Sequence, residues 1–292
     1  MPLNCDTGVG AATQLLWVRL AALLLIVVAF CVAMFGASMP PGTLTYWCIF
    51  CWVFSFTGTL LVVLVEVLGL QDRLPVSWPN FQITIAHYAC LLCISASRIP
   101  FVPFKYQVYD NVHQYLLMSK LVSGLAAIAF VRVIRLSEVT TAPGRMSVFQ
   151  TFVACIILMI VSDPVVYNSH VALQWCMAVY CICFILSMAV VVLYVAGRTD
   201  CQSTIASKLL PAYGLLAVIM YATAAVIWPM FRYQTTHLLS TEMIIVAVLT
   251  AINFLLYLMD LAFTAKRVFC GAREERRKQR NSGHMLRDGE QK

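Results

Sequence analysis

The sequence predicts an all-α integral membrane protein with eight transmembrane helices, arranged as two tandem four-helix modules of the same orientation. Three observations predict this class: the composition, a series of apolar runs long enough to cross a bilayer, and a span that recurs half a chain later. Of the 292 residues, 61% are hydrophobic and only 11% are charged. A soluble domain has about 25% charged residues, so this chain lacks the polar surface that water requires.

Eight apolar runs are long enough to cross the membrane. The hydrocarbon core is about 30 Å thick, and a helix rising about 1.5 Å per residue crosses it with roughly 20 apolar residues. The expected spans are Leu15–Phe35, Leu44–Leu68, Phe81–Ser97, Leu116–Leu136, Val148–Val166, Val171–Ala196, Leu209–Phe231 and Met243–Phe263. No basic residue precedes the first run, as one would in a signal peptide, so we expect it to be a retained helix.

The second and sixth spans look like copies of one helix. Shifting Trp47–Gly69 by 128 positions places it on Trp175–Gly197 and matches the Trp-Cys pair at the start and the glycine at the end. A second resemblance, at a shift of 124, pairs Ala127–Phe130 with Ala251–Phe254. Repetition over half a chain predicts a duplicated module. The expected parts are a cytoplasmic N-terminal segment (1–14), a first module (15–140), a second module (145–265) and a basic cytoplasmic tail (266–292).

The basic residues predict the orientation. An even number of spans places both termini on one side, and with the termini inside, sixteen of the twenty Lys and Arg residues fall on the cytoplasmic side. This asymmetry follows the positive-inside rule. All six tryptophans fall near expected span ends, which is typical of the aromatic belts at membrane interfaces. We therefore expect both termini to be cytoplasmic.

Several strings of residues resemble the myeloid-associated differentiation marker family over roughly residues 15 to 265. They include Phe149–Ile157, Ser162-Asp163-Pro164 and Trp228-Pro229 in the second half, and Leu74-Pro75 with Ser77-Trp78 in the first. The resemblance implies two tandem MARVEL-like four-helix modules, a superfamily associated with membrane apposition, vesicle trafficking and cholesterol-rich microdomains. The segment after the third span, the region around Arg132 and Arg135, and the basic tail depart from the family pattern, which leaves the partners open.

Three polar residues inside the expected spans are candidates for fastening helices together: Glu66, His87 and Asn253. Polar groups in a membrane usually pair with one another, and interhelical hydrogen bonds contribute roughly 0.6–2 kcal/mol. We expect Glu66 to pair with Arg132 or Arg135, or to face the lipid headgroups. Small residues at Ser119, Ser123 and Ala127 form a face that suits either packing within a module or association between chains, including a homo-oligomer.

The tail is the most informative polar segment. From Ala265 to Lys292 it has nine Lys and Arg against four Asp and Glu. Basic residues next to a span attract anionic lipids of the inner leaflet, and a juxtamembrane cysteine beside them is a candidate for S-acylation. The expected lipid contacts are Lys266, Arg267, Arg273, Arg276, Arg277, Lys278 and Arg280, and the expected acylation site is Cys270. A simple stop-transfer role for these charges is the alternative.

The twelve cysteines are expected to be packing residues, because most of them lie inside apolar runs. The C-x-x-C pair Cys90/Cys93 lacks a second pair at metal-site spacing, so packing is the preferred interpretation there as well. Cys48 and Cys176 hold equivalent positions in the repeat, which leaves a disulfide between them as a hypothesis. No metal site or cofactor is expected.

The sequence favours a non-enzymatic membrane organiser at the plasma membrane or on secretory-route vesicles, in contact with cholesterol-rich and anionic lipids and with other membrane proteins. A transporter or channel for a small solute or ion is the alternative, and it would have to rely mainly on His87 and Asn253 as midplane polar groups. A lipid-modifying enzyme is a third class, but no catalytic set of residues is visible in the sequence. Nucleic-acid binding is not expected, since no folded domain or aromatic platform accompanies the basic tail.

Overall fold

The structure is a computed structural model of the chain and describes residues 5–36, 42–98, 110–137, 142–162, 167–197, 204–236 and 241–290. The described residues are helical and contain no strand. The chain divides into two compact units: unit 1 comprises Met1–Val148 and Ala189–Arg198, and unit 2 comprises Phe149–Met188 and Thr199–Lys292. Each unit is described by itself below.

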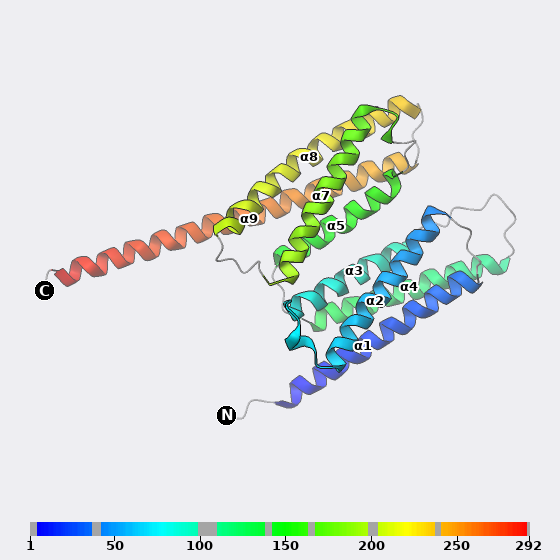
Figure 1. The fold of residues 1–292 in the computed structure, drawn as a ribbon, viewed down its shortest axis with the longest axis horizontal. Coiled ribbons are helices and arrows are strands. Elements are labelled where there is room, and N and C mark those ends of the chain that lie inside the picture. Colours follow the sequence, from blue (N-terminus) through cyan, green and yellow to red (C-terminus); the bar gives the residue numbers. More distant parts are fainter. Residues whose placement is uncertain are drawn as a thin grey trace. The chain divides into compact units, whose positions relative to one another are not determined.

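Unit 1 is a bundle of four long helices. These are α1 (Cys5–Cys31, continued by the π-helical turn η1, Val32–Gly36), α2 (Thr43–Val67), α3 (Trp78–Arg98) and α4 (Asp110–Leu136), with a short 3₁₀ turn η2 (Gln71–Arg73) between α2 and α3. Helix α1 packs against α2 and α4, and α3 packs against the same two helices (Figure 1). The four helices therefore close around one interior.

Unit 2 contains most of α5 (Ala142–Val161) and of α7 (Val171–Val195), together with α8 (Thr204–Thr236) and α9 (Thr241–Glu290), and these helices lie together in Figure 1. All four helices contribute side chains to a single core. Its fully enclosed members include Ile157 from α5, Cys176 and Val179 from α7, Ala224 from α8 and Val246 from α9. The interior also contains a group of tyrosines and several buried polar residues, including Gln150, Ser187, Thr250 and Asn253.

Six helical segments are long and apolar enough to cross a membrane: Thr13–Gly36, Thr43–Val67, Gln114–Leu136, Val171–Val195, Pro211–Gln234 and Thr241–Lys266. They coincide with six of the eight expected spans. The expected third span forms α3, whose 21 residues suffice in length, but its many polar residues lower its hydropathy. The expected fifth span has a shorter apolar described part, Met146–Val161. A multi-pass membrane protein is thus confirmed, whereas the number eight stays a prediction.

Several helices extend beyond the expected spans. Helix α1 begins at Cys5, so most of the expected N-terminal segment is helical. Helix α8 continues through Pro229 to Thr236, although the sequence suggested a span ending near that proline. Helix α9 does not end with the membrane span but continues from Lys266 to Glu290, so the described part of the tail is helical (Figure 1).

The aromatic-belt interpretation is wrong for four of the six tryptophans. Trp17 and Trp175 are exposed, but the other four are buried inside the protein: Trp47, Trp52, Trp78 and Trp228. An indole buried in a bundle needs a partner for its N–H group. For Trp52 this partner is Ser123 of α4, at 3.0 Å. Trp47 also donates from its indole to Ser95, whereas the buried indole N–H groups of Trp78 and Trp228 have no hydrogen-bond partner among the described residues. Packing inside the bundle, and not the lipid interface, therefore decides the positions of these four side chains.

Candidate functional site

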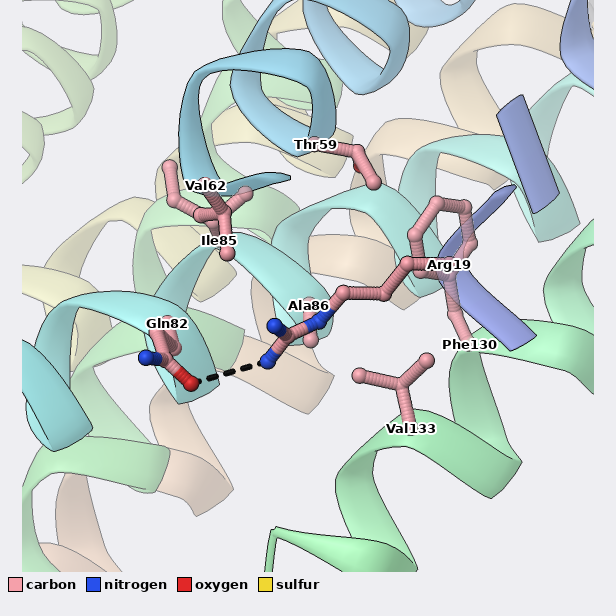
Figure 2. A pocket seen from close by; sticks show the side chains of 8 residues that line it. All are labelled: Arg19, Thr59, Val62, Gln82, Ile85, Ala86, Phe130 and Val133. Carbon is pink, nitrogen blue, oxygen red and sulfur yellow. Dashed lines mark hydrogen bonds between the residues drawn. The ribbon is translucent and has the colours of Figure 1, made fainter. Parts of the chain in front are cut away.

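The most polar point in the interior of unit 1 joins three helices. Arg19 of α1 is 2% exposed, and its guanidinium pairs with the carboxylate of Glu66 at the end of α2. The same guanidinium donates a 2.8 Å hydrogen bond to Oε1 of Gln82, in the first turns of α3 (Figure 2). An arginine in a membrane is costly unless it is paired, and these two partners meet that requirement.

The expected partners of Glu66 were the wrong ones. Both Arg132 and Arg135 have exposed side chains on α4, and the carboxylate pairs with Arg19 instead. Sequence distance concealed this pair, since 47 positions separate the two residues. The only signal in the sequence was a lone arginine within an otherwise uncharged apolar run.

A small pocket lies beside the guanidinium. Its empty volume is about 200 Å³, and its walls come from α1, α2, α3 and α4 (Figure 2). Thr59 and Gln82 are polar, whereas Val62, Ile85 and Phe130 are apolar. Much of that volume is open to solvent, and the space for the centre of a water-sized molecule is only about 10 Å³, which is about what a single water needs. The arrangement is therefore suited to holding α1, α2 and α3 together.

The small-residue face of α4 packs within unit 1. Ser119 and Ser123 are each 1% exposed and Ala127 is 5% exposed. The hydroxyl of Ser119 donates to the carbonyl of Ala29 in α1 at 2.9 Å, which joins α4 to α1 at close range. Of the two interpretations left open by the sequence, packing inside the module explains this face.

His87 is buried on α3, and its Nδ1 donates to the carbonyl of Ile83, 2.8 Å away in the preceding turn of the same helix. Cys90 and Cys93, on the same helix, are buried free thiols. Cys48 and Cys176 are also free thiols, each fully enclosed within its own unit.

Unit 2 contains a cluster of buried hydroxyl groups that the sequence analysis missed. Ser187 of α7 lies 2.7 Å from the phenolic oxygen of Tyr213 in α8 and 2.5 Å from that of Tyr257 in α9. Tyr213 in turn donates to Tyr257 at 3.2 Å. A tyrosine inside an apolar run looks like an ordinary hydrophobic residue, and only the packing of three helices shows that these hydroxyls meet.

Asn253 is fully buried on α9, and its Nδ2 donates to the hydroxyl of Tyr221 in α8 at 2.7 Å. One turn away on α9, Thr250 bonds to the hydroxyl of Tyr180 in α7 at 2.9 Å. The carbonyl oxygen of Asn253 has no hydrogen-bond partner among the described residues. Asn253 thus joins α9 to α8 through its Nδ2 group alone.

The outward faces of both units are apolar. Large exposed side chains include Leu24 and Leu121 in unit 1 and Ile185, Val226 and Leu255 in unit 2, each more than half exposed. Polar residues inside and apolar residues outside is the arrangement expected when lipid is the solvent. The protein therefore contacts the lipid bilayer with most of its helical surface.

The predicted tail residues all lie on α9. Lys266 is exposed at the end of the candidate span, and Arg267, Cys270, Arg273, Arg276, Arg277, Lys278 and Arg280 follow it on the same continuous helix. At about 1.5 Å per residue, Arg273 lies roughly 10 Å and Arg280 roughly 21 Å along the helix axis from Lys266. The structure therefore brings only the first of these residues close to the membrane end.

Comparison with known proteins defines the class. The family model described as MARVEL, membrane-associating domain, matches residues 138–263, which include all of α5, α7 and α8 and most of the apolar part of α9. Together with the apolar helices, this makes the protein a multi-pass membrane protein with a MARVEL domain. No solved structure matches the chain.

Relatives identify the family. The myeloid-associated differentiation marker homolog of Xenopus laevis is 38% identical, covering 92% of this chain and 99% of the relative. The human myeloid-associated differentiation marker is 36% identical over 86% and 87% of the two chains. The rat myeloid-associated differentiation marker-like protein 2 is 32% identical over 75% and 80%. The chain belongs to the myeloid-associated differentiation marker family.

Proposed function

We propose that this protein is a non-enzymatic membrane organiser of the MARVEL type. It gathers ordered, cholesterol-rich membrane and other membrane proteins against the outer flanks of its helices, and so affects membrane organisation, trafficking or cortical attachment. The observation that carries the proposal is the distribution of polarity. Within each unit, most buried polar groups bond to other groups of the same unit, whereas many large apolar side chains are exposed on the outside. The surface that can bind lipids and other membrane proteins is therefore the surface that faces the bilayer.

The proposal includes two tandem four-helix modules, although the MARVEL model matches only the second half of the chain. Equivalent positions are buried in both units when α1, α2 and α3 are shifted by 128 onto α5, α7 and α8. The buried pairs are Ala22/Gln150, Ile26/Ala154, Ala29/Ile157, Cys48/Cys176, Trp52/Tyr180, Ser55/Cys183, Thr59/Ser187, Ala89/Ala217, Cys93/Tyr221 and Ala96/Ala224. A shared register of burial over three helices is difficult to obtain by chance.

Two hydrogen bonds recur in the same register. Trp47 Nε1 donates to Ser95 Oγ at 2.9 Å, and at a shift of 128, Trp175 Nε1 donates to Thr223 Oγ1 at 3.2 Å. The second pair is the Trp52–Ser123 bond of unit 1 and the Tyr180–Thr250 bond of unit 2, in which the tryptophan and tyrosine are 128 positions apart and the serine and threonine 127. These bonds join equivalent pairs of helices and support a duplicated module.

The duplicated register extends to the fourth helix, but at a shift of 127. Ser119, Ser123, Ala126 and Phe130 of α4 correspond to Val246, Thr250, Asn253 and Tyr257 of α9, and all eight are buried. The shift of 124 suggested by the short sequence match pairs buried Ala127 with exposed Ala251. The burial register therefore favours 127. Four helices per module give the two modules one orientation, with both termini in the cytoplasm.

The membrane-proximal end of the tail supports a local lipid contact at the inner leaflet. Lys266 and Arg267 are next to the end of the span, and Cys270 follows one turn later on the same helix. A basic residue near an anionic surface contributes about 1 kcal/mol. S-acylation of Cys270 would add a second anchor at this level. Palmitate labelling that is equal in the wild type and in Cys270→Ser would contradict the acylation.

The central test is partitioning in phase-separated vesicles drawn from living plasma membranes. A fluorescent fusion of the full chain is expected to concentrate in the ordered phase, and to lose this preference after cholesterol extraction. Proximity labelling with and without residues 265–292 would then identify the neighbours that depend on the tail. Exclusion from the ordered phase, together with an unchanged set of neighbours, would refute the organiser proposal.

A further inference from the structure

The tail continues the last membrane span as one helix, and its basic residues repeat in the helical register. Helix α9 runs without interruption from Thr241 to Glu290, and Figure 1 shows its C-terminal part extending beyond the other helices of unit 2. Within it, Lys266, Arg273, Arg280 and Arg287 recur every seven residues. A spacing of seven keeps residues on one face of a helix, with a drift of only about 20° per repeat.

Two further arginines broaden this face. Arg276 and Arg277 follow Arg273 at three and four residues, which are the spacings of neighbours on a helix surface. We call the six positions Lys266, Arg273, Arg276, Arg277, Arg280 and Arg287 the basic stripe. At about 100° per residue they fall within an arc of roughly 100°. The acidic residues Glu274 and Glu275 lie outside this arc, as do Arg267 and Lys278.

The stripe is too long to be neutralised by a flat membrane surface. A helix that continues a membrane span leads away from the bilayer, and at about 1.5 Å per residue Arg287 lies roughly 31 Å beyond Lys266. Attraction to anionic lipids falls off within a Debye length, about 8 Å at physiological salt. Only the first turn of the stripe is within that distance. A second copy of the chain is also a poor occupant, because two parallel stripes of the same sign repel each other.

We propose that the basic stripe is a docking surface for an acidic helical segment of a partner protein, which lies alongside α9 in the cytoplasm over about four to six turns. A helical partner matches the stripe because Glu or Asp at intervals of three, four and seven residues would face the basic positions along its whole length. The inference deepens the proposed function by giving the chemistry of a protein partner, and it depends on that function only for the side of the membrane involved.

The test uses the full chain in nanodiscs of phosphatidylcholine, where both faces are accessible and neither membrane orientation nor lipid order affects the result. The probe is a labelled 21-residue helical peptide with Glu residues at intervals of three, four and seven, and the control peptide has the same composition with the Glu residues spread around the helix. Fluorescence anisotropy should show at least tenfold tighter binding of the striped peptide. Equal binding of the two peptides would overturn the proposal.

Two variants with equal loss of charge separate position from net charge. Arg276→Gln with Arg280→Gln removes two stripe residues and should weaken binding of the striped peptide at least tenfold. Arg267→Gln with Lys278→Gln removes two basic residues outside the stripe and should weaken it less than threefold. Equal weakening by both variants would overturn the proposal, since general charge attraction would then explain the binding.

Hydrogen exchange of the tail amides distinguishes the other occupants. Protection of residues 273–287 should be the same in phosphatidylcholine nanodiscs and in nanodiscs that contain phosphatidylserine, and it should rise when the striped peptide is added. Stronger protection by phosphatidylserine alone would mean that the stripe lies on lipid. Protection that rises with protein concentration would mean that a second copy occupies it. Either result would overturn the proposal.

Discussion

At the residue scale, Arg19 shows how this protein manages charge inside a membrane bundle. Its guanidinium is almost fully enclosed and bonds to groups from two other helices, Glu66 and Gln82. Because the pair is partly buried, each charge depends on the other for compensation. The ion pair and the hydrogen bond to Gln82 therefore specify how α1, α2 and α3 meet. The contribution of the pair to stability is measurable when one partner is removed.

Replacing Glu66 tests this dependence. Glu66→Leu leaves the buried guanidinium without a counter-charge and should lower the free energy of unfolding by about 3 kcal/mol, at the lower end of the range for breaking a buried pair. The double variant Arg19→Leu with Glu66→Leu should recover much of that loss. Unfolding by heat in detergent micelles measures both. Arg132→Gln, at an exposed position, is the control and should change stability by less than about 0.5 kcal/mol.

Asn253 and Tyr221 lead to an asymmetric prediction. Tyr221→Phe leaves the fully buried amide of Asn253 without its partner and should cost about 1–3 kcal/mol. Asn253→Leu removes the same hydrogen bond but also removes a carbonyl oxygen that has no partner among the described residues, so it should cost less. The double variant should resemble Asn253→Leu. A larger loss in Asn253→Leu than in Tyr221→Phe, measured by the same unfolding assay, would contradict this account.

At the scale of elements, α2 and α7 end in the same way. Each is followed by a glycine in the left-handed region, Gly69 with φ of 62° and Gly197 with φ of 68°. The amide of Gly69 donates to the carbonyl of Glu66 at 3.2 Å and the amide of Leu70 donates to the carbonyl of Val65 at 3.0 Å, a pattern that closes the helix. The two glycines are 128 positions apart, as in the sequence repeat.

Alanine at these two ends should therefore be unfavourable. Gly69→Ala and Gly197→Ala should each lower the free energy of unfolding by about 1 kcal/mol, because a Cβ atom disfavours the left-handed backbone. Gly124→Ala is the matched control: it lies inside α4, and an added Cβ would meet nothing within 4 Å. That variant should be neutral or slightly stabilising. Thermal unfolding of the three single variants makes the comparison, and a neutral Gly69→Ala would count against the helix end described here.

At the scale of the whole molecule, the two units place different residues at equivalent positions in their interiors. In unit 1, Ile85 and Phe130 line the pocket beside Arg19. The equivalent positions in unit 2 are Tyr213 and Tyr257, whose hydroxyls meet at Ser187. An ion pair in one unit and a set of tyrosine hydroxyls in the other thus serve the same purpose of joining helices. Under the proposed duplication, the two modules would have diverged at these positions while keeping their register.

Two modules of four spans each predict that both termini lie on the same side. Epitope tags at residue 1 and residue 292 should both be inaccessible to antibody in intact cells, and both should become accessible after the plasma membrane is permeabilised. A tag on a known cytosolic protein serves as the control for cell integrity. Detection of only one terminus in intact cells would mean an odd number of spans and would contradict the tandem arrangement.

The sequence by itself determined the class of protein, the position of most spans and the family, because these depend on composition, on the length of apolar runs and on recurring strings such as Trp47-Cys48 and Trp175-Cys176. It also singled out Glu66, His87 and Asn253 as the polar residues to explain. The class of protein and the spans follow from the solvent: a bilayer selects long apolar helices whatever their partners are.

Only the tertiary structure decided which polar groups meet. Glu66 pairs with Arg19 and not with Arg132 or Arg135, four tryptophans face the interior, and the tyrosines of unit 2 converge on Ser187. The physical reason is that lipid treats every apolar face alike, so hydrophobicity alone does not say which face of a helix turns inward. Hydrogen bonds and close packing between helices far apart in the sequence make that choice, and they exist only once the bundle has formed.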